Sequence, residues 1–488
     1  MGAPTPPPAR SAGQITHLKG RWIDGWDPEA GDQWEGGGQR IAQRNLGFSI
    51  YAEFLGFVVW QLWSIVVVSL DGWKGFAFTD SQQFWLISLP ALVGATLRFP
   101  YTLMVSKVGG RNWTIVSAAL LLLPTTAMSF AIANHPDANG QGGTSYSVML
   151  LVAALAGFGG GNFASSMANI TFFFPQRTKG WALGLNAAGG NIGAAVAQFT
   201  VPILVTLTAA AVTGGGPKVP NLPIAGWFWI PFIVLAMVLA YFGMNNLTSA
   251  KADMAGYRAA LKDPHLWLLS FLYIGTFGSF IGLAGAFPKL IADQFPAFKL
   301  INLGVVGIGL AFTGPLVGSL ARPFGGKLAD KVGGAYITVA CFTVMIAAAF
   351  AAIRVLAGHS PSFWAFLACF LVLFIATGVG NGSMYKMIPT IFAYRGGQQD
   401  AAKASAGIAT ERKTSSALGI ISAFGAYGGF LMPQMFSLAL RQRADVGPDH
   451  VVQGYTLGLW WLIVAYTVFL VCTVAFYVVP FLGRNTRL

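Results

Sequence analysis

Long apolar stretches alternate with short polar segments over most of this chain. Twelve of the apolar stretches are long enough to cross a hydrocarbon core of about 30 Å as helices. They lie at approximately 47–70, 83–105, 113–134, 145–174, 181–211, 224–245, 265–294, 300–325, 335–357, 362–393, 414–440 and 455–482. A polar break over residues 246–264 divides them six and six. The pattern therefore predicts an all-α polytopic membrane protein with twelve transmembrane helices in two six-helix halves.

The polar ends and the central break set the predicted domain limits. We expect an N-terminal tail at 1–45, a first half at 46–245, a linker at 246–264, a second half at 265–482 and a C-terminal tail at 483–488. The N-terminal tail opens with closely spaced prolines and carries mixed charges. It has no short apolar segment of the kind found in a signal peptide. We expect it to be solvated and mostly disordered.

One motif occurs once in each half, with a constant separation of 224 residues. Arg98 stands nine residues before a Lys-Val-Gly-Gly turn that begins at Lys107, and Arg322 stands nine residues before the same turn at Lys331. Nine residues of helix span roughly 13 Å. If the lysine marks the membrane interface, each half therefore places one arginine near the middle of the bilayer. Such duplication is typical of transporters built from internal repeats.

Composition and charge support a membrane protein over other classes. Of the 488 residues only 10% are charged, whereas soluble chains carry about 25%. The net charge of +13 would suit a nucleic-acid partner, but the basic residues lie at the ends of apolar stretches rather than in a patch, so we expect none. Loops after the even-numbered spans hold thirteen Lys and Arg against seven on the opposite side. We therefore expect a multi-pass protein of the cell (inner or plasma) membrane with both termini in the cytoplasm.

The sequence offers no support for an enzyme. Its three cysteines, Cys341, Cys369 and Cys472, lie in apolar stretches without paired spacing, so we expect neither a disulfide framework nor a metal site. A nucleophile triad and a phosphate-binding loop are also missing from the sequence, and we expect no cofactor.

The two arginines carry the functional prediction. A guanidinium group is planar, permanently charged and forked, which suits recognition of a small planar or tetrahedral oxyanion. Alternatively, each arginine is neutralised by a buried acid or extends to an interface. Glu53 is the one clear acid deep within a predicted span, so it can neutralise one arginine but not both. We therefore predict that Arg98 and Arg322 bind an anion.

Glycine-rich spans and one aromatic set accompany the arginines. GxxxG pairs at 157/161 and 189/193 predict close helix packing, which also narrows a cavity around a small ligand. Tyr273 and Phe277 are four residues apart and share a helix face, and Phe163 lies in span 4. Rings of this kind can clamp a flat anion beside an arginine, although aromatic pairs at helical spacing are more often ordinary core.

Several runs together resemble one transporter family. They are Gly161-Asn-Phe-Ala-Ser-Ser-Met-Ala-Asn169 with its continuation to Pro175, the stretch from Ala182 to Gln198, Thr96-Leu-Arg98 with the following Pro-Tyr, Tyr273 to Gly282, and the glycine run of span 11. They resemble the NarK-like nitrate/nitrite porters of the major facilitator superfamily over essentially the whole membrane region. Gly326-Lys-Leu-Ala-Asp330 also matches a general superfamily motif, whereas the first half has Ser106 at the position of the acid.

The resemblance implies a function and a set of site residues. It implies a major facilitator fold that transports nitrate and nitrite by alternating access, most simply as an antiporter and as a monomer. Arg98 and Arg322 would grip the anion, while Phe163, Tyr273 and Phe277 would line the site. Asn191 would add polar contacts, and so would Ser422 of span 11.

Glu53 leaves the coupling mechanism open. Some family members resemble proton symporters, and a titratable carboxylate in span 1 can carry a proton. Equally, Glu53 may serve only to offset positive charge in the cavity. Lys386 in span 10 is expected to be ion-paired or to extend to the inner face rather than to bind substrate. Rival hypotheses are a porter for another small anion, a porter for a larger organic anion or a sugar, which would need a wider polar cavity, and a membrane sensor, which would need a soluble output domain.

Overall fold

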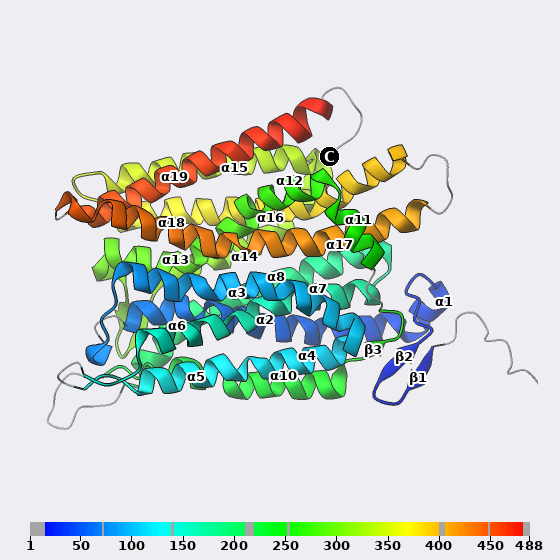
Figure 1. The fold of residues 1–488 in the computed structure, drawn as a ribbon, viewed down its shortest axis with the longest axis horizontal. Helices are drawn as coiled ribbons and strands as arrows, with labels where there is room; N and C mark the ends of the chain where they lie inside the picture. The colour runs from blue at the N-terminus through cyan, green and yellow to red at the C-terminus, as the bar shows by residue number, and fades with distance from the viewer. Residues whose placement is uncertain are drawn as a thin grey trace, which may run out of the picture.

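Long helices lying side by side make up most of the molecule (Figure 1). The computed structural model describes residues 15–70, 73–137, 141–209, 219–250, 254–399, 406–447 and 449–481. The predicted C-terminal tail and the first 14 residues of the predicted N-terminal tail lie outside these ranges. Helices of the first half form the lower part of the view in Figure 1, and helices of the second half form the upper part.

The main helices follow the predicted order of spans. The first half contains α2 (Gln39–Leu70), α3 (Asp80–Val108), α4 (Gly110–Leu120), α5 (Leu122–Ala133), α6 (Tyr146–Leu155), α7 (Gly157–Phe173), α8 (Gln176–Leu207), α9 (Ile224–Trp227) and α10 (Ile230–Gly243). The linker contains α11 (Met254–Leu261). The second half contains α12 (Pro264–Tyr273), α13 (Ser279–Gln294), α14 (Thr313–Val332), α15 (Gly334–Leu356), α16 (Phe363–Gln399), α17 (Ala406–Ala426), α18 (Gly428–Gln442) and α19 (His450–Thr473). A π-helical segment, η3 (Ile274–Gly278), joins α12 to α13.

The predicted all-α polytopic fold is confirmed, with one shift of position. Within the described residues, eleven helical segments are long and apolar enough to cross a membrane. The eighth span was predicted at 300–325, but its first part forms a hairpin of β4 (Ile301–Leu303) and β5 (Val306–Ile308) that turns at Gly304, where φ is 67°. The corresponding helix, α14, begins only at Thr313 and includes four charged side chains, so it is less apolar than the other spans.

The duplicated turns have the same structure in both halves. Gly109 follows α3 with a φ of 91°, and Gly333 follows α14 with a φ of 111°, a conformation that side chains other than hydrogen disfavour. The Gly109 amide donates to the Val105 carbonyl at 3.1 Å, and the Gly333 amide donates to Ala329 at 2.9 Å. Five residues after each glycine, a threonine hydroxyl donates to the carbonyl four residues back, at 2.8 Å in both copies. The sequence repeat is therefore also a structural repeat.

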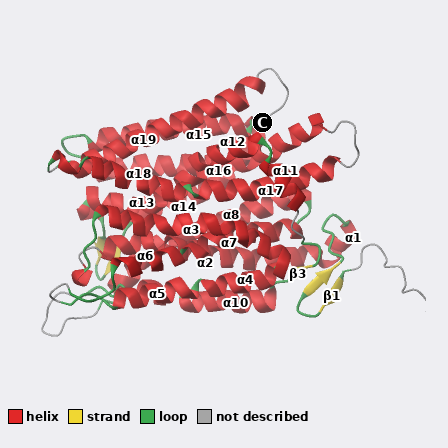
Figure 2. Cartoon of the chain, in the orientation of Figure 1, coloured by secondary structure: helices red, strands yellow, loops and turns green. Residues whose placement is uncertain are grey.

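The prediction of a mostly disordered N-terminal tail is wrong for residues 15–45. Strands β1 (Thr16–Leu18) and β2 (Trp22–Asp24) form an antiparallel pair, and β2 also pairs in parallel with β3 (Asn246–Leu247) of the linker. This small sheet lies at the right-hand end of the bundle in Figure 2. The tail is therefore hydrogen-bonded to the segment that follows the first half.

Two tryptophans explain why this polar segment is ordered. Trp26 packs edge-on against Phe173, and Trp34 packs in the same way against Phe174, with centroid separations of 5.7 and 5.9 Å. Both indoles are buried. Burial of such large apolar surfaces is favourable enough to order a short segment whose average composition is polar.

Glycines allow the closest helix contacts, as the sequence predicted. A Cβ atom placed on Gly159 of α7 would overlap the carbonyl oxygen of Gly56 on α2. In the second half, a Cβ atom on Gly378 of α16 would overlap the carbonyl oxygen of Gly318 on α14. Small residues at these positions let the helix backbones touch and so position the side chains between them.

Candidate functional site

Arg98 lies inside the bundle and connects the two halves. Its side chain is held on α3 and is 0% exposed. One terminal nitrogen, Nη1, donates to both the carbonyl oxygen and the hydroxyl of Ser422 on α17, each at 2.8 Å. Nε donates to the carbonyl oxygen of Gly160 on α7 at 3.2 Å. The arginine of the first half is therefore already bonded to a helix of the second half.

Both arginines contact the same pair of aromatic rings. The guanidinium carbon of Arg98 lies 4.5 Å from the ring centroid of Phe163 and 5.1 Å from that of Phe277. The guanidinium carbon of Arg322 lies 6.0 Å from each of these centroids. Through Phe163 alone, the two carbons can be no further apart than the sum of 4.5 and 6.0 Å, or 10.5 Å. The structure thus brings together two cations that are distant in the sequence.

Aromatic residues of the second half surround Arg322. Tyr273 and Phe277 stack with their centroids 5.4 Å apart, and Phe277 stacks on Phe163 at 5.9 Å across the two halves. The Arg322 Nη2 group donates to the Tyr273 hydroxyl at 3.5 Å, a long bond. The guanidinium group also lies over the ring of Tyr385 at 4.7 Å. Ring faces attract cations, so this lining holds the guanidinium groups without neutralising them.

Each arginine retains a donor group without a protein partner. Arg98 Nη2 and Arg322 Nη1 are buried and have no hydrogen-bond acceptor among the described residues. Neither arginine forms an ion pair with a carboxylate in the part of the chain that the structure describes. Two nearby buried cations repel each other strongly at low dielectric. A small anion that accepted hydrogen bonds from both free groups would relieve this repulsion.

Asn191 and Glu53 stand apart from this cluster. Asn191 is buried on α8 and its side-chain carbonyl has no partner, but no hydrogen bond between described residues joins it to either arginine. Glu53 is 1% exposed on α2, where its Oε2 accepts from the Asn186 amide at 2.8 Å. Asn186 also donates to Ser166 at 2.7 Å. Glu53 is therefore held by neutral polar groups beside a small cavity lined largely by serines.

The interpretation of Lys386 as an ion-paired residue is confirmed. Its ammonium group lies 2.6 Å from the Asp330 carboxylate, and both side chains are about half exposed. Asp330 is the acid of the superfamily motif on α14, so this pair ties α14 to α16 within the second half.

Sequence reasoning missed Tyr385, although a signal was present. The dipeptide Gly-Asn occurs in span 4 as Gly161-Asn162 and again in span 10 as Gly380-Asn381. In span 4 the next residue is Phe163 of the site, and in span 10 Tyr385 follows Asn381 by four residues, on the same helix face. The motif that marked one half would thus have pointed to an aromatic residue in the other. Trp60, whose ring lies 5.5 Å from the Arg98 guanidinium carbon, was also missed.

Comparisons with known proteins give a consistent result. The profile of the Major Facilitator Superfamily matches residues 52–433. The nitrate/nitrite transporter NarU of Salmonella typhimurium is 41% identical over 86% of this chain and 90% of its own length. A probable nitrate/nitrite antiporter of Thermus thermophilus, NarK2, is 33% identical over 89% and 93% of the two chains. Among solved structures, an inward-facing bacterial homologue of the human lysosomal transporter Spinster matches with a TM-score of 0.59 at 18% identity, over 90% of this chain and 96% of that one, a likeness of fold alone.

Proposed function

Because this chain belongs to the NarK-like nitrate/nitrite porters of the Major Facilitator Superfamily, we propose that it exchanges nitrate for nitrite across the membrane. Named relatives at 33–41% identity are transporters of these anions or a probable antiporter of them, and they are not enzymes. The single observation that carries the proposal is the pair of buried arginines that share the Phe163 and Phe277 rings.

The proposed anion site combines the free arginine donors with the aromatic lining. A nitrate ion is planar, so its oxygens can accept from Arg98 Nη2 and Arg322 Nη1 while its faces lie against the rings. Phe163, Tyr273 and Phe277 exclude water and strengthen these charged hydrogen bonds. Ser422 contributes by holding Arg98 in place, and Asn191 contributes from the neighbouring helix α8 when the halves move. The close fit favours ions of three or four atoms over larger organic anions or sugars.

The repulsion between the arginines explains why exchange is favoured over one-way transport. With the site empty, closing the halves over two uncompensated guanidinium charges costs several kcal/mol. A bound nitrate or nitrite removes part of this cost, so the loaded protein changes its accessibility faster than the empty one. Rocking of the two halves about this site provides the alternating access.

The proposal includes the orientation and the functional unit. The excess of Lys and Arg in the loops on one side places both termini in the cytoplasm of a cell whose plasma or inner membrane holds the protein. One chain contributes both arginines, so the monomer is the transport unit. No cofactor takes part.

Transport by purified protein in proteoliposomes tests this proposal. Uptake of labelled nitrate should require nitrite or nitrate inside the vesicles and should be insensitive to an imposed pH gradient. Uptake that needs no internal anion but requires a proton gradient would overturn the antiport mechanism. Protein-free vesicles and vesicles loaded with sulfate serve as controls.

Nitrate/proton symport is the second candidate because of Glu53. Its Oε1 is buried and has no partner among the described residues, and the carboxylate adjoins a small cavity lined by Ser49, Ser165 and Ser166. Protonation at Oε1 would therefore leave the Asn186 bond to Oε2 intact. The same vesicles decide between the two mechanisms, since symport predicts uptake driven by an inward proton gradient alone.

A further inference from the structure

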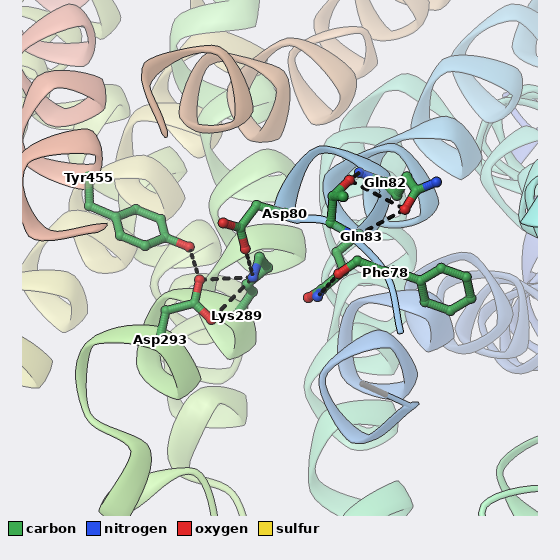
Figure 3. A network of polar contacts seen from close by, with 8 residues as sticks. Phe78, Asp80, Gln82, Gln83, Lys289, Asp293 and Tyr455 are labelled. Carbon is green, nitrogen blue, oxygen red and sulfur yellow. Dashed lines mark hydrogen bonds and ion pairs between the residues drawn. The ribbon is translucent and has the colours of Figure 1, made fainter. Parts of the chain in front are cut away.

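Five residues form a polar cluster at the end of the bundle opposite the N-terminal sheet. We call it the latch, and it consists of Asp80, Phe84, Lys289, Asp293 and Tyr455. Lys289 of α13 pairs with Asp80 of α3 at 2.8 Å and with Asp293 of its own helix at 2.9 Å. The Tyr455 hydroxyl of α19 donates to Asp293 at 2.5 Å. Figure 3 shows Lys289 between the two carboxylates.

The latch joins the two halves of the transporter. Asp80 and Phe84 belong to the first half and are four residues apart on α3, so they share a helix face. The Lys289 ammonium contacts both, since it also lies 5.7 Å from the Phe84 ring centroid. Further along the same seam, Gln434 of α18 donates to Ser88 of α3 at 2.7 Å. In the proposed orientation, this is the outer end of the protein.

The pair between the halves can break without stranding a buried charge. Lys289 is 3% exposed, so losing its only counterion would be costly. Asp293 lies one turn along the same helix and is held by Tyr455, so it remains with Lys289 when α3 moves away. Asp80 is also provided for, because it is 42% exposed and occupies the first turn of α3, where the amide groups of the helix favour negative charge.

We propose that the Asp80–Lys289 pair is the outer gate latch, which closes and opens in each transport cycle. Each partner keeps a stabilising group on its own half, so the open state is accessible and the closed state gains one ion pair. This inference rests on the proposed transport function, but not on the identity of the anion.

Labelling of a buried reporter cysteine tests the latch directly. Ser88 lies on α3 between Asp80 and Arg98 and is 0% exposed. In a protein whose three native cysteines are replaced by alanine, Ser88→Cys should react slowly with a membrane-impermeant maleimide added outside. Asp80→Asn or Lys289→Gln should raise the labelling rate about tenfold, because the population with an open outer end increases.

Two matched variants separate a latch from a general loss of stability. Asp293→Asn changes the same charge in the same cluster but leaves the pair between the halves, so its labelling rate should stay at the parent value. The charge swap Asp80→Lys with Lys289→Asp should return the rate towards that of the parent. Unchanged labelling in both Asp80→Asn and Lys289→Gln, or an equal rise in Asp293→Asn, would overturn the proposal.

A cross-link provides the second measurement. Asp80→Cys with Lys289→Cys should form a disulfide that stops anion exchange, and reductant should restore it. Exchange that continues in the fully cross-linked protein would contradict the latch. The labelling experiment needs no substrate, so it still tests the latch if the transported anion proves to be neither nitrate nor nitrite.

Discussion

Replacing Arg98 by lysine separates the charge of this residue from its geometry. In the structure, Arg98 uses Nη1 for Ser422 and Nε for the Gly160 carbonyl, which leaves Nη2 for the anion. A lysine keeps the positive charge but carries all its donors on one atom. It cannot hold both protein partners and present a second nitrogen to the anion.

The size of the effect follows from the hydrogen bonds that are lost. A hydrogen bond to a charged group contributes about 1.5–3 kcal/mol. Loss of the one from Nη2 should therefore weaken nitrate binding roughly 10- to 150-fold. The rings of Phe163 and Phe277 also lose a flat partner, so the true effect should lie towards the upper end of that range.

Calorimetric titration of the purified protein with nitrate measures this loss. Arg354→Lys is the matched control, since Arg354 is exposed near the end of α15 and far along the chain from the site residues. The control should bind nitrate like the parent. An Arg98→Lys protein that binds nitrate with the parent Kd, and exchanges it normally in vesicles, would refute the assigned role of the guanidinium fork.

Three other substitutions test separate parts of the account. Glu53→Gln removes the titratable group but keeps its size, so exchange in proteoliposomes should persist with an unchanged pH profile; proton-driven uptake that vanishes in this variant would instead support symport. Gly428→Ala places a methyl group against the backbone of η3, which should cost about 1–3 kcal/mol and lower the Tm. Gly184→Ala adds its methyl in open space and should leave the Tm unchanged, so equal Tm values for the two variants would contradict the packing argument. Tyr385→Leu removes the ring 4.7 Å from Arg322 and should raise the KM for nitrate severalfold, whereas Tyr385→Phe should not; equal KM values would exclude a role for the ring.

The sequence predicted what depends on long or repeated patterns. The apolar stretches gave the order of the spans, and the constant separation of the two Lys-Val-Gly-Gly turns gave the duplicated halves. It also predicted which side chains would meet: Arg98, Arg322, Phe163 and Phe277 come from four different spans and share one cluster. That prediction relied on the family resemblance, because spacing along the chain cannot relate residues on different helices.

Local errors arose where tertiary contacts override composition. Residues 300–308 are apolar enough for a helix, but glycine at 304 favours the hairpin turn. The tail is polar on average, yet Trp26 and Trp34 find aromatic partners on α7 that no local pattern reveals. Partners on other helices are also what decided the surroundings of Glu53, which is bonded to Asn186 rather than to either arginine.

A structure determined with nitrate bound would test the central claim most directly. The account predicts a single nitrate with oxygens about 3 Å from Arg98 Nη2 and from Arg322 Nη1, against the rings of Phe163 and Phe277. Nitrate bound elsewhere, or held by one arginine while the other pairs with a carboxylate, would contradict it.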